Sequence, residues 1–243
     1  MTVRTAVRRL QSDLGQLIER HDTAKSLADY SVYSDDPIGF IRDVLHADPW
    51  DRQLDIAEAV RDHPLIVVRS CNAAGKDFIA AHLALWWVYA RKGLVLMTGP
   101  TERQVKEIAM GEVARAFSRA RDLPGELYAT ALRLGRDETA GILAFTSTEA
   151  SKLTGHHADR ILAILTEAQG VADWAWEALM ACAVGDEDRL LAVGNPIEPS
   201  GTFFSVSRSP DWCAIRISAE EHPNLVQGRT VIPGGVTQAM ALR

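Results

Sequence analysis

The feature that most constrains this chain is an apolar run that leads into a Gly-Lys turn and then into an apolar helical pattern. Residues 65–68 are Leu-Ile-Val-Val, Gly75 and Lys76 form the turn, and residues 78–85 have the composition of a buried helix. Backbone N–H groups at the start of a helix face an anion, and a lysine placed there reaches the outer phosphates of a nucleotide. The segment therefore predicts a phosphate-binding loop, and a plain strand–turn–helix with a surface lysine is the alternative.

The loop departs from the common G-x-x-x-x-G-K-[ST] pattern at both ends. Ser70 stands in place of the first glycine, and Asp77 stands in place of the serine or threonine. We expect the N–H groups of residues 73–77 to surround the phosphates, with Lys76 neutralising the β- and γ-phosphates. The predicted nucleotide-binding residues of the loop are Ser70, Asn72, Ala73, Ala74, Gly75, Lys76 and Asp77.

A second apolar run, residues 161–165, ends in Thr166-Glu167, where an NTPase usually carries Asp-Glu. In P-loop NTPases the loop hydroxyl and that aspartate together hold Mg²⁺. Here the carboxylate is in the loop, at Asp77, and the hydroxyl follows the strand, at Thr166, so the two residue types have exchanged places. One carboxylate and one hydroxyl are suitable ligands for a hard cation, which predicts a magnesium site at Asp77 and Thr166. A decayed site and a wrongly placed strand are the alternatives.

The bulk composition is that of an ordinary soluble globular chain of 243 residues with a net charge of −6. The charge argues against a surface coated in basic residues but allows a local basic patch. The three cysteines are scattered without C-x-x-C spacing, which favours a reducing compartment and no structural zinc. We expect no export and no membrane span, because the N-terminus lacks an apolar signal core and no apolar run is long enough.

The apolar runs alternate with helical patterns along most of the chain, which predicts an α/β fold with a mostly parallel central sheet flanked by helices. We expect residues 1–34 to form an N-terminal helical arm and residues 35–225 to form the main domain. Residues 226–243 lose periodicity and are expected to begin a linker toward a further C-terminal domain. The expected strands are 65–69, 93–98, 131–134, 142–145, 161–165, 189–193 and 212–217.

Several short motifs follow one another in a fixed order along residues 35–225. They are Gln53, Asn72-Ala73-Ala74-Gly75-Lys76, Gly99-Pro100-Thr101-x-x-Gln104, Leu153-Thr154-Gly155-His156-His157, Thr166-Glu167-Ala168-Gln169-Gly170-Val171 and Gly194-Asn195-Pro196. Each motif alone is weak, but the ordered set resembles the ATPase domain of a tailed-bacteriophage terminase large subunit, the motor that packages viral DNA. The resemblance implies a P-loop NTPase fold of the RecA-like (ASCE) kind, with ATP and Mg²⁺ as cofactors.

The resemblance also assigns roles to three residues outside the loop. Glu167 would orient and activate the attacking water, and a carboxylate that merely stabilises a helix N-terminus is the alternative. Gln53 would read the adenine, unless Asp51 caps a helix and leaves Gln53 exposed. Asn195 would contact the γ-phosphate or the water, unless Asn-Pro only starts a turn.

An arginine finger is harder to assign, because the segment 151–155 contains no arginine. Lys152, Arg160, Arg69 and Arg103 are the candidates. The adjacent His156 and His157 point apart on a strand or a helix and have no third ligand in register, so we expect no metal there. Trp174 and Trp176 are expected to serve as core and subunit-contact surface.

The resemblance implies ATP hydrolysis that drives double-stranded DNA into a procapsid in the host cytoplasm. The implied partners are DNA, the portal protein, the small terminase subunit and further copies of the chain in a ring, by resemblance a pentamer, although the isolated domain could be a monomer. In this family an RNase H-like nuclease domain follows the ATPase, and no nuclease activity is expected from the present residues. The alternatives are a RecA-like helicase or translocase and a catalytically silent nucleotide-binding assembly module.

Overall fold

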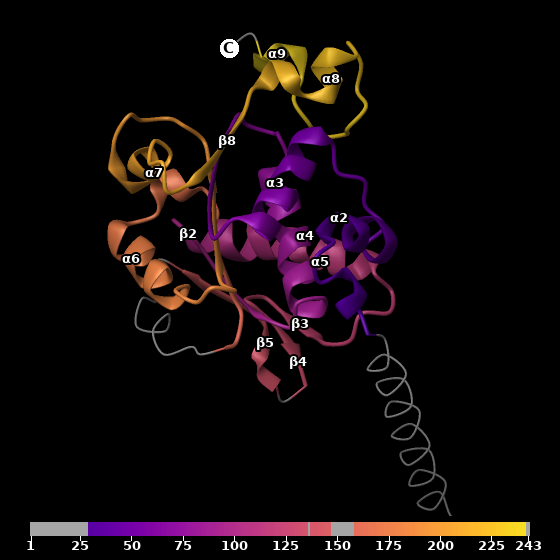
Figure 1. Ribbon diagram of the computed structural model, residues 1–243. Helices are drawn as coiled ribbons and strands as arrows, with labels where there is room; N and C mark the ends of the chain where they lie inside the picture. Colours follow the sequence, from indigo (N-terminus) through magenta and orange to yellow (C-terminus); the bar gives the residue numbers. More distant parts are fainter. Residues whose placement is uncertain (1–28, 136, 147–157, 242–243) are drawn as a thin grey trace, which may run out of the picture.

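The computed structural model describes residues 29–135, 137–146 and 158–241, and within them eight strands form one sheet in the order β3-β4-β5-β2-β6-β7-β1-β8 (Figure 1). The six strands from β5 to β8 in this order run parallel, and β3 and β4 add an antiparallel edge next to β5. The predicted α/β fold with a mostly parallel central sheet is therefore confirmed. The strands are β1 Leu65–Ser70, β2 Leu94–Gly99, β3 Glu126–Tyr128, β4 Ala131–Leu134, β5 Asp137–Thr146, β6 Ile161–Leu165, β7 Arg189–Gly194 and β8 Cys213–Ile217.

Helices cover both faces of the sheet, with α3, α4 and α5 on one side and α6 and α7 on the other (Figure 1). The α-helices are α2 Pro37–Gly39, α3 Asp51–Asp62, α4 Lys76–Tyr89, α5 Met110–Arg119, α6 Asp173–Cys182, α7 Gly201–Val206, α8 Pro223–Val226 and α9 Gln238–Ala241. Two π-helical segments, η2 Phe40–Val44 and η3 Gln104–Ala109, and three 3₁₀ turns, η1 Ser31–Tyr33, η5 Ala168–Gly170 and η6 Ala219–Glu221, complete the described elements.

The apolar strands alternate between two cores, because successive side chains of a strand point to opposite faces. In β1, Ile66 and Val68 join the core under α3 and α4, whereas Val67 joins the core under α6 and α7. Helix α4 is buried almost all around, since it lies between the sheet and its neighbouring helices. Trp176 is fully buried in the second core, as expected, and Trp174 is 37% exposed.

The topology brings the phosphate-binding loop, Glu167 and Asn195 to one edge of the sheet. The loop follows β1, Glu167 follows β6, and Asn195 follows β7, which lies between the other two strands. The carboxyl ends of parallel strands meet at the same edge, where ligands of open α/β sheets bind. No helix in the described part is long and apolar enough to cross a membrane.

His82 gives the fold a predictable acid sensitivity. It lies buried in α4, where burial lowers its pKa from 6.5 to about 4, although a hydrogen bond to Phe78 O opposes the shift. The unfolded chain takes up this proton near pH 6.5, so the contribution to stability is complete above that pH and is lost as the pH falls toward 4. Between pH 7.5 and pH 5.0 we expect this group to remove about 2 kcal/mol of unfolding free energy.

Urea unfolding at the two pH values tests this prediction. His82→Leu should lose about 2 kcal/mol less than wild type over the interval. His63→Leu, at an exposed position after α3, is the matched control and should keep the steeper loss. Equal slopes for wild type and His82→Leu would show that His82 does not titrate as its burial requires.

Candidate active site

The phosphate-binding loop has the backbone shape that its sequence predicts. Ser70 is buried at the end of β1, and Gly75 lies in the left-handed region with φ +80°, immediately before α4 begins at Lys76. A Cβ on Gly75 would lie 2.3 Å from Gln53 Nε2, so glycine is needed for space as well as for conformation. The start of α4 therefore presents its first N–H groups at the carboxyl edge of the sheet, as a phosphate site requires.

Lys76 and Glu167, predicted from segments ninety residues apart, form an ion pair. Lys76 Nζ lies 2.9 Å from Glu167 Oε1 and 3.9 Å from Asp77 Oδ2, and the lysine is only 7% exposed. Glu167 has φ +46° and ψ +46°, a left-handed conformation that is costly for a residue other than glycine. The structure thus brings the predicted catalytic pair together and holds the carboxylate in a strained turn.

The environment of Glu167 keeps its carboxylate charged. Burial raises its pKa, but the hydrogen bonds from Lys76 and from Gln169 Nε2 (2.7 Å) outweigh burial, and the net shift is downward. A carboxylate held in the charged form near neutral pH can accept a proton or a hydrogen bond from water. The chemistry of a water-activating base is therefore available at this position.

Asp77 is placed as a cation ligand would be. Burial raises the pKa of its carboxyl; Lys76 opposes this shift, and Glu167 and Glu112 add to it. Asp77 Oδ1 is buried without a hydrogen-bond partner among the described residues. A buried carboxylate oxygen with no partner is unfavourable, and a bound cation would satisfy it.

Thr166 lies at the same edge, after β6. It is 1% exposed, and its hydroxyl makes one long hydrogen bond, 3.5 Å to Thr98 O. Among the described residues no group of three or more His, Cys, Asp or Glu side chains is arranged to hold a metal. The donor set of Asp77 and Thr166 fits Mg²⁺ rather than zinc, because Mg²⁺ takes few protein ligands and completes its shell with phosphate oxygens and water.

Gln53 is buried in the structure, and the alternative of an exposed Gln53 with Asp51 as the cap is wrong. Helix α3 begins at Asp51 after Trp50, and Gln53 is 5% exposed. Its Oε1 accepts from Trp50 N at 3.2 Å, and its Nε2 donates to Gly75 O at 3.0 Å. Gln53 therefore braces the phosphate loop, and its reading of adenine stays a prediction.

A cavity of about 350 Å³ lies beside the loop, and residues far along the chain form one wall of it. Trp50 donates from Nε1 to Ala74 O and makes an edge contact with His222, while residues 232–235 line the opposite side. Asn224 holds that segment in place, accepting from the N–H groups of residues 231 and 232 and donating to Ile232 O. Sequence reasoning missed this wall, because residues 226–243 carry no periodic pattern.

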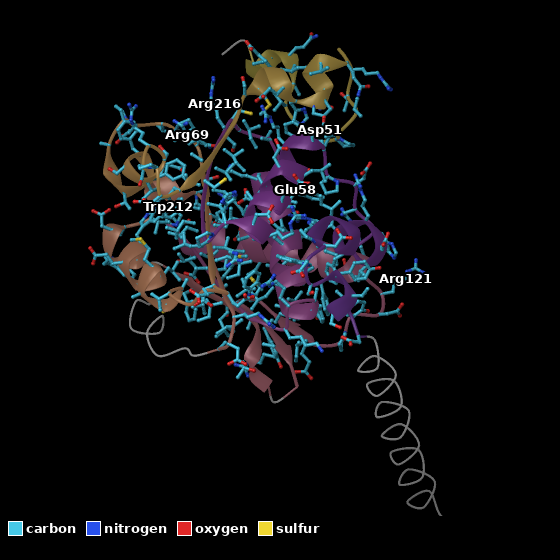
Figure 2. The ribbon with its side chains drawn as sticks, viewed as in Figure 1. Asp51, Glu58, Arg69, Arg121, Trp212 and Arg216 are labelled. Carbon is cyan, nitrogen blue, oxygen red and sulfur yellow. The ribbon has the colours of Figure 1, made fainter. Side chains whose placement is uncertain are left out.

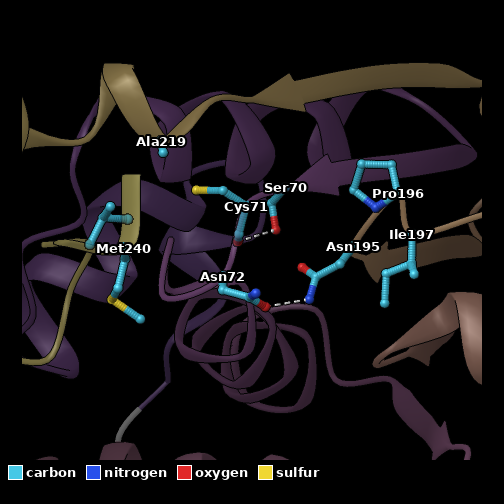
Figure 3. A pocket seen from close by; sticks show the side chains of 9 residues that line it. Ser70, Cys71, Asn72, Asn195, Pro196, Ile197, Ala219 and Met240 are labelled. Atoms are coloured by element: carbon cyan, nitrogen blue, oxygen red, sulfur yellow. Dashed lines mark hydrogen bonds between the residues drawn. The ribbon is translucent and has the colours of Figure 1, made fainter. Parts of the chain in front are cut away.

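Asn195 connects the end of β7 to the loop. Its Nδ2 donates to Asn72 Oδ1 at 2.6 Å, and its backbone N–H donates to Gln169 Oε1 at 3.0 Å (Figure 3). The pair flanks a cavity of about 450 Å³ that Cys71 and Ile197 also line. Asn195 is therefore more than a turn residue, and Gln169 is a site residue that the sequence analysis quoted only as part of a motif.

The arginine-finger candidates lie in different places. Arg160 precedes β6, at the edge opposite to Glu167, and donates to Arg91 O at 3.0 Å. Arg103 is exposed and pairs with Glu107 at 3.1 Å. Arg69 lies near the end of β1, next to Arg216 on β8 (Figure 2). Lys152 and the motif at residues 153–157 lie outside the described residues.

The comparisons with known proteins agree with this geometry. No protein-family model matches the chain. Over 80 residues it is 35% identical to a protein of Enterobacteria phage P7 named "Probable terminase, large subunit". That segment is 29% of this chain and 16% of the relative, so the chain matches less than a fifth of the relative's length.

Solved structures extend the likeness to most of the domain. The large terminase ATPase domain of Thermus phage P74-26 superposes with a TM-score of 0.63 at 19% identity, covering 81% of this chain and 94% of that one. The large terminase of a second, thermophilic bacteriophage, in complex with ADP, gives a TM-score of 0.56 at 12% identity, covering 78% of this chain and 48% of that one. The chain therefore has the P-loop fold of phage large terminase ATPase domains and shares part of its sequence with a probable large terminase, which confirms the resemblance that its motifs indicated.

Proposed function

We propose that this chain binds ATP with Mg²⁺ and hydrolyses it. The observation that carries the proposal is the convergence of Lys76, Asp77 and Glu167 at the carboxyl edge of the sheet, with Lys76 Nζ within 4 Å of both carboxylates. A phosphate-binding loop, a charged carboxylate base and a cation ligand in one place are the parts that phosphoryl transfer to water requires.

Each residue has a defined task in this proposal. The first N–H groups of α4 and Lys76 bind the β- and γ-phosphates and offset their charge. Asp77 and Thr166 hold Mg²⁺, which when bound neutralises phosphate oxygens. Glu167 orients the water opposite the γ-phosphate and accepts its proton, and Asn195 contacts the γ-phosphate from the end of β7. Gln53 and Trp50 keep the loop in shape beside the cavity proposed for the adenine.

The free chain must rearrange for this to happen, because Lys76 cannot serve Glu167 and the phosphates equally. In the structure Lys76 donates to Glu167 at 2.9 Å. An arriving triphosphate competes for the same ammonium group and carries more negative charge than one carboxylate. Nucleotide binding thus releases Glu167 from Lys76 and frees an oxygen for water.

We further propose that hydrolysis drives double-stranded DNA into a phage procapsid in the host cytoplasm. The support is the shared fold with terminase ATPase domains and the sequence match to the phage P7 protein. The partners are DNA, bound through its phosphates, the portal protein, the small terminase subunit and further copies of the chain in a ring. An arginine finger supplied by a neighbouring copy belongs to the same proposal.

Steady-state ATP hydrolysis with Mg²⁺ tests the proposal, with and without double-stranded DNA. Lys76→Ala should reduce turnover by about 100-fold or more, because the outer phosphates lose their main countercharge. Lys92→Ala is the matched control, since Lys92 is exposed and pairs with Asp29 far from the loop. Lys76-dependent ATP binding without any turnover would favour the silent module, and stimulation by single-stranded DNA alone would favour the helicase.

A further inference from the structure

The carboxylate of Glu167 has a second anchor besides Lys76. Gln169 Nε2 donates to Glu167 Oε2 at 2.7 Å, and Gln169 Oε1 accepts from the backbone N–H of Asn195 at 3.0 Å. A carboxylate can only accept and an N–H can only donate, so the two partners fix which end of the amide faces which neighbour. We infer that Gln169 is a positioning residue of the hydrolytic site, whose amide ties the Glu167 carboxylate to the end of β7. This inference rests on the proposed ATPase function.

The end of β7 is shaped to receive the glutamine. A Cβ on Gly194 would lie 2.3 Å from Gln169 Oε1, so any other residue at position 194 would push the amide away. The close approach therefore depends on a glycine at the point where the amide meets the strand. Glycine has this use wherever another group must come close to the backbone.

The amide matters most when nucleotide is bound. Glu167 then loses Lys76 to the phosphates, and Gln169 is the remaining described side chain that donates to its carboxylate. The strained turn at Glu167 gives the side chain no other fixed orientation, because its backbone lies in a sparsely populated region. Gln169 would therefore keep one oxygen of the carboxylate fixed while the other faces the water.

The same amide links hydrolysis to the loop. Asn195 contacts Asn72 through its side chain and Gln169 through its backbone, so a shift of the loop on phosphate binding reaches Glu167 through two hydrogen bonds. These contacts close a circuit from Lys76 to Glu167, Gln169, Asn195, Asn72 and back to the loop. Gln169 is the member of this circuit that makes the position of Glu167 depend on β7.

Gln169→Met tests the inference, because it keeps the length of the side chain and removes both ends of the amide. With the full chain, Mg²⁺ and DNA, we expect kcat to fall about 10- to 100-fold and KM for ATP to stay within about twofold. Gln169→Glu keeps an acceptor for Asn195 N–H and turns an oxygen toward Glu167, and it should lose at least as much. Gly194→Ala displaces the same amide and should lower kcat in the same way. Gln227→Met, at an exposed position after α8, is the matched control.

A mutant cycle separates positioning from a general loss of structure. In single-turnover assays Gln169→Met should change the residual rate of a Glu167→Ala chain by less than about twofold, because its action passes through Glu167. A full tenfold effect in that background, or wild-type kcat in folded Gln169→Met, would overturn the inference while leaving the ATPase proposal intact. A wild-type chain without ATP turnover would overturn both.

Discussion

Replacing Glu167 by glutamine should lower kcat for ATP hydrolysis by about 100-fold or more and leave ATP affinity equal or higher. Glutamine keeps the size of the side chain but cannot take a proton from water, and general-base catalysis contributes about 10² to 10⁴ in rate. Affinity should not fall, because the wild-type carboxylate holds Lys76 at 2.9 Å and thus competes with the phosphates. The change frees Lys76 for the nucleotide.

The measurement combines single-turnover hydrolysis with equilibrium binding of a fluorescent ATP analogue. Glu177→Gln, the same chemical change on an exposed position of α6, is the matched control and should behave as wild type. A kcat within about threefold of wild type would mean that another group activates the water. A large loss of affinity would instead make Glu167 a binding residue.

Much of the fold follows from local sequence patterns. The strands β1, β2, β6 and β7 are nearly continuous apolar runs, as expected for strands buried on both faces. The loop was recognisable because Gly75 and Lys76 stand between such a strand and an apolar helix. Helix 105–120 is less simple than predicted, since it begins with the π-helical η3 before α5. Apolar spacing alone does not separate these two helical forms.

The contacts that assemble the site were less accessible from sequence. Gln169 is a half-buried glutamine in a short turn, and its partner at Asn195 is a backbone N–H, which no residue type announces. The Trp50–His222 contact joins residues far apart in the chain, and the segment 232–235 reaches the cavity only through the hydrogen bonds of Asn224. Such long-range pairings depend on the strand order, which local patterns do not determine.

The exchange of residue types between Asp77 and Thr166 leads to the second large effect. We expect Asp77→Thr and Thr166→Asp each to lower kcat/KM for ATP by about 100-fold, and the double variant to return to within about tenfold of wild type. Asp77→Thr alone leaves the cation without a carboxylate. Thr166→Asp alone adds a second carboxylate to a site that already holds the buried, unpartnered Asp77 Oδ1.

The double variant restores one carboxylate and one hydroxyl in the more common arrangement, so the two substitutions should be strongly coupled. Steady-state hydrolysis across a Mg²⁺ titration measures this coupling, and excess EDTA should abolish turnover in every active variant. Glu112→Gln is a useful control, because Glu112 lies near Asp77 and raises its pKa but pairs with Arg115; it should leave the coupling unchanged. A double variant whose loss equals the sum of the single losses would refute the exchange. The site would then be decayed, since a site that holds no cation has no reason to require one carboxylate and one hydroxyl in complementary positions.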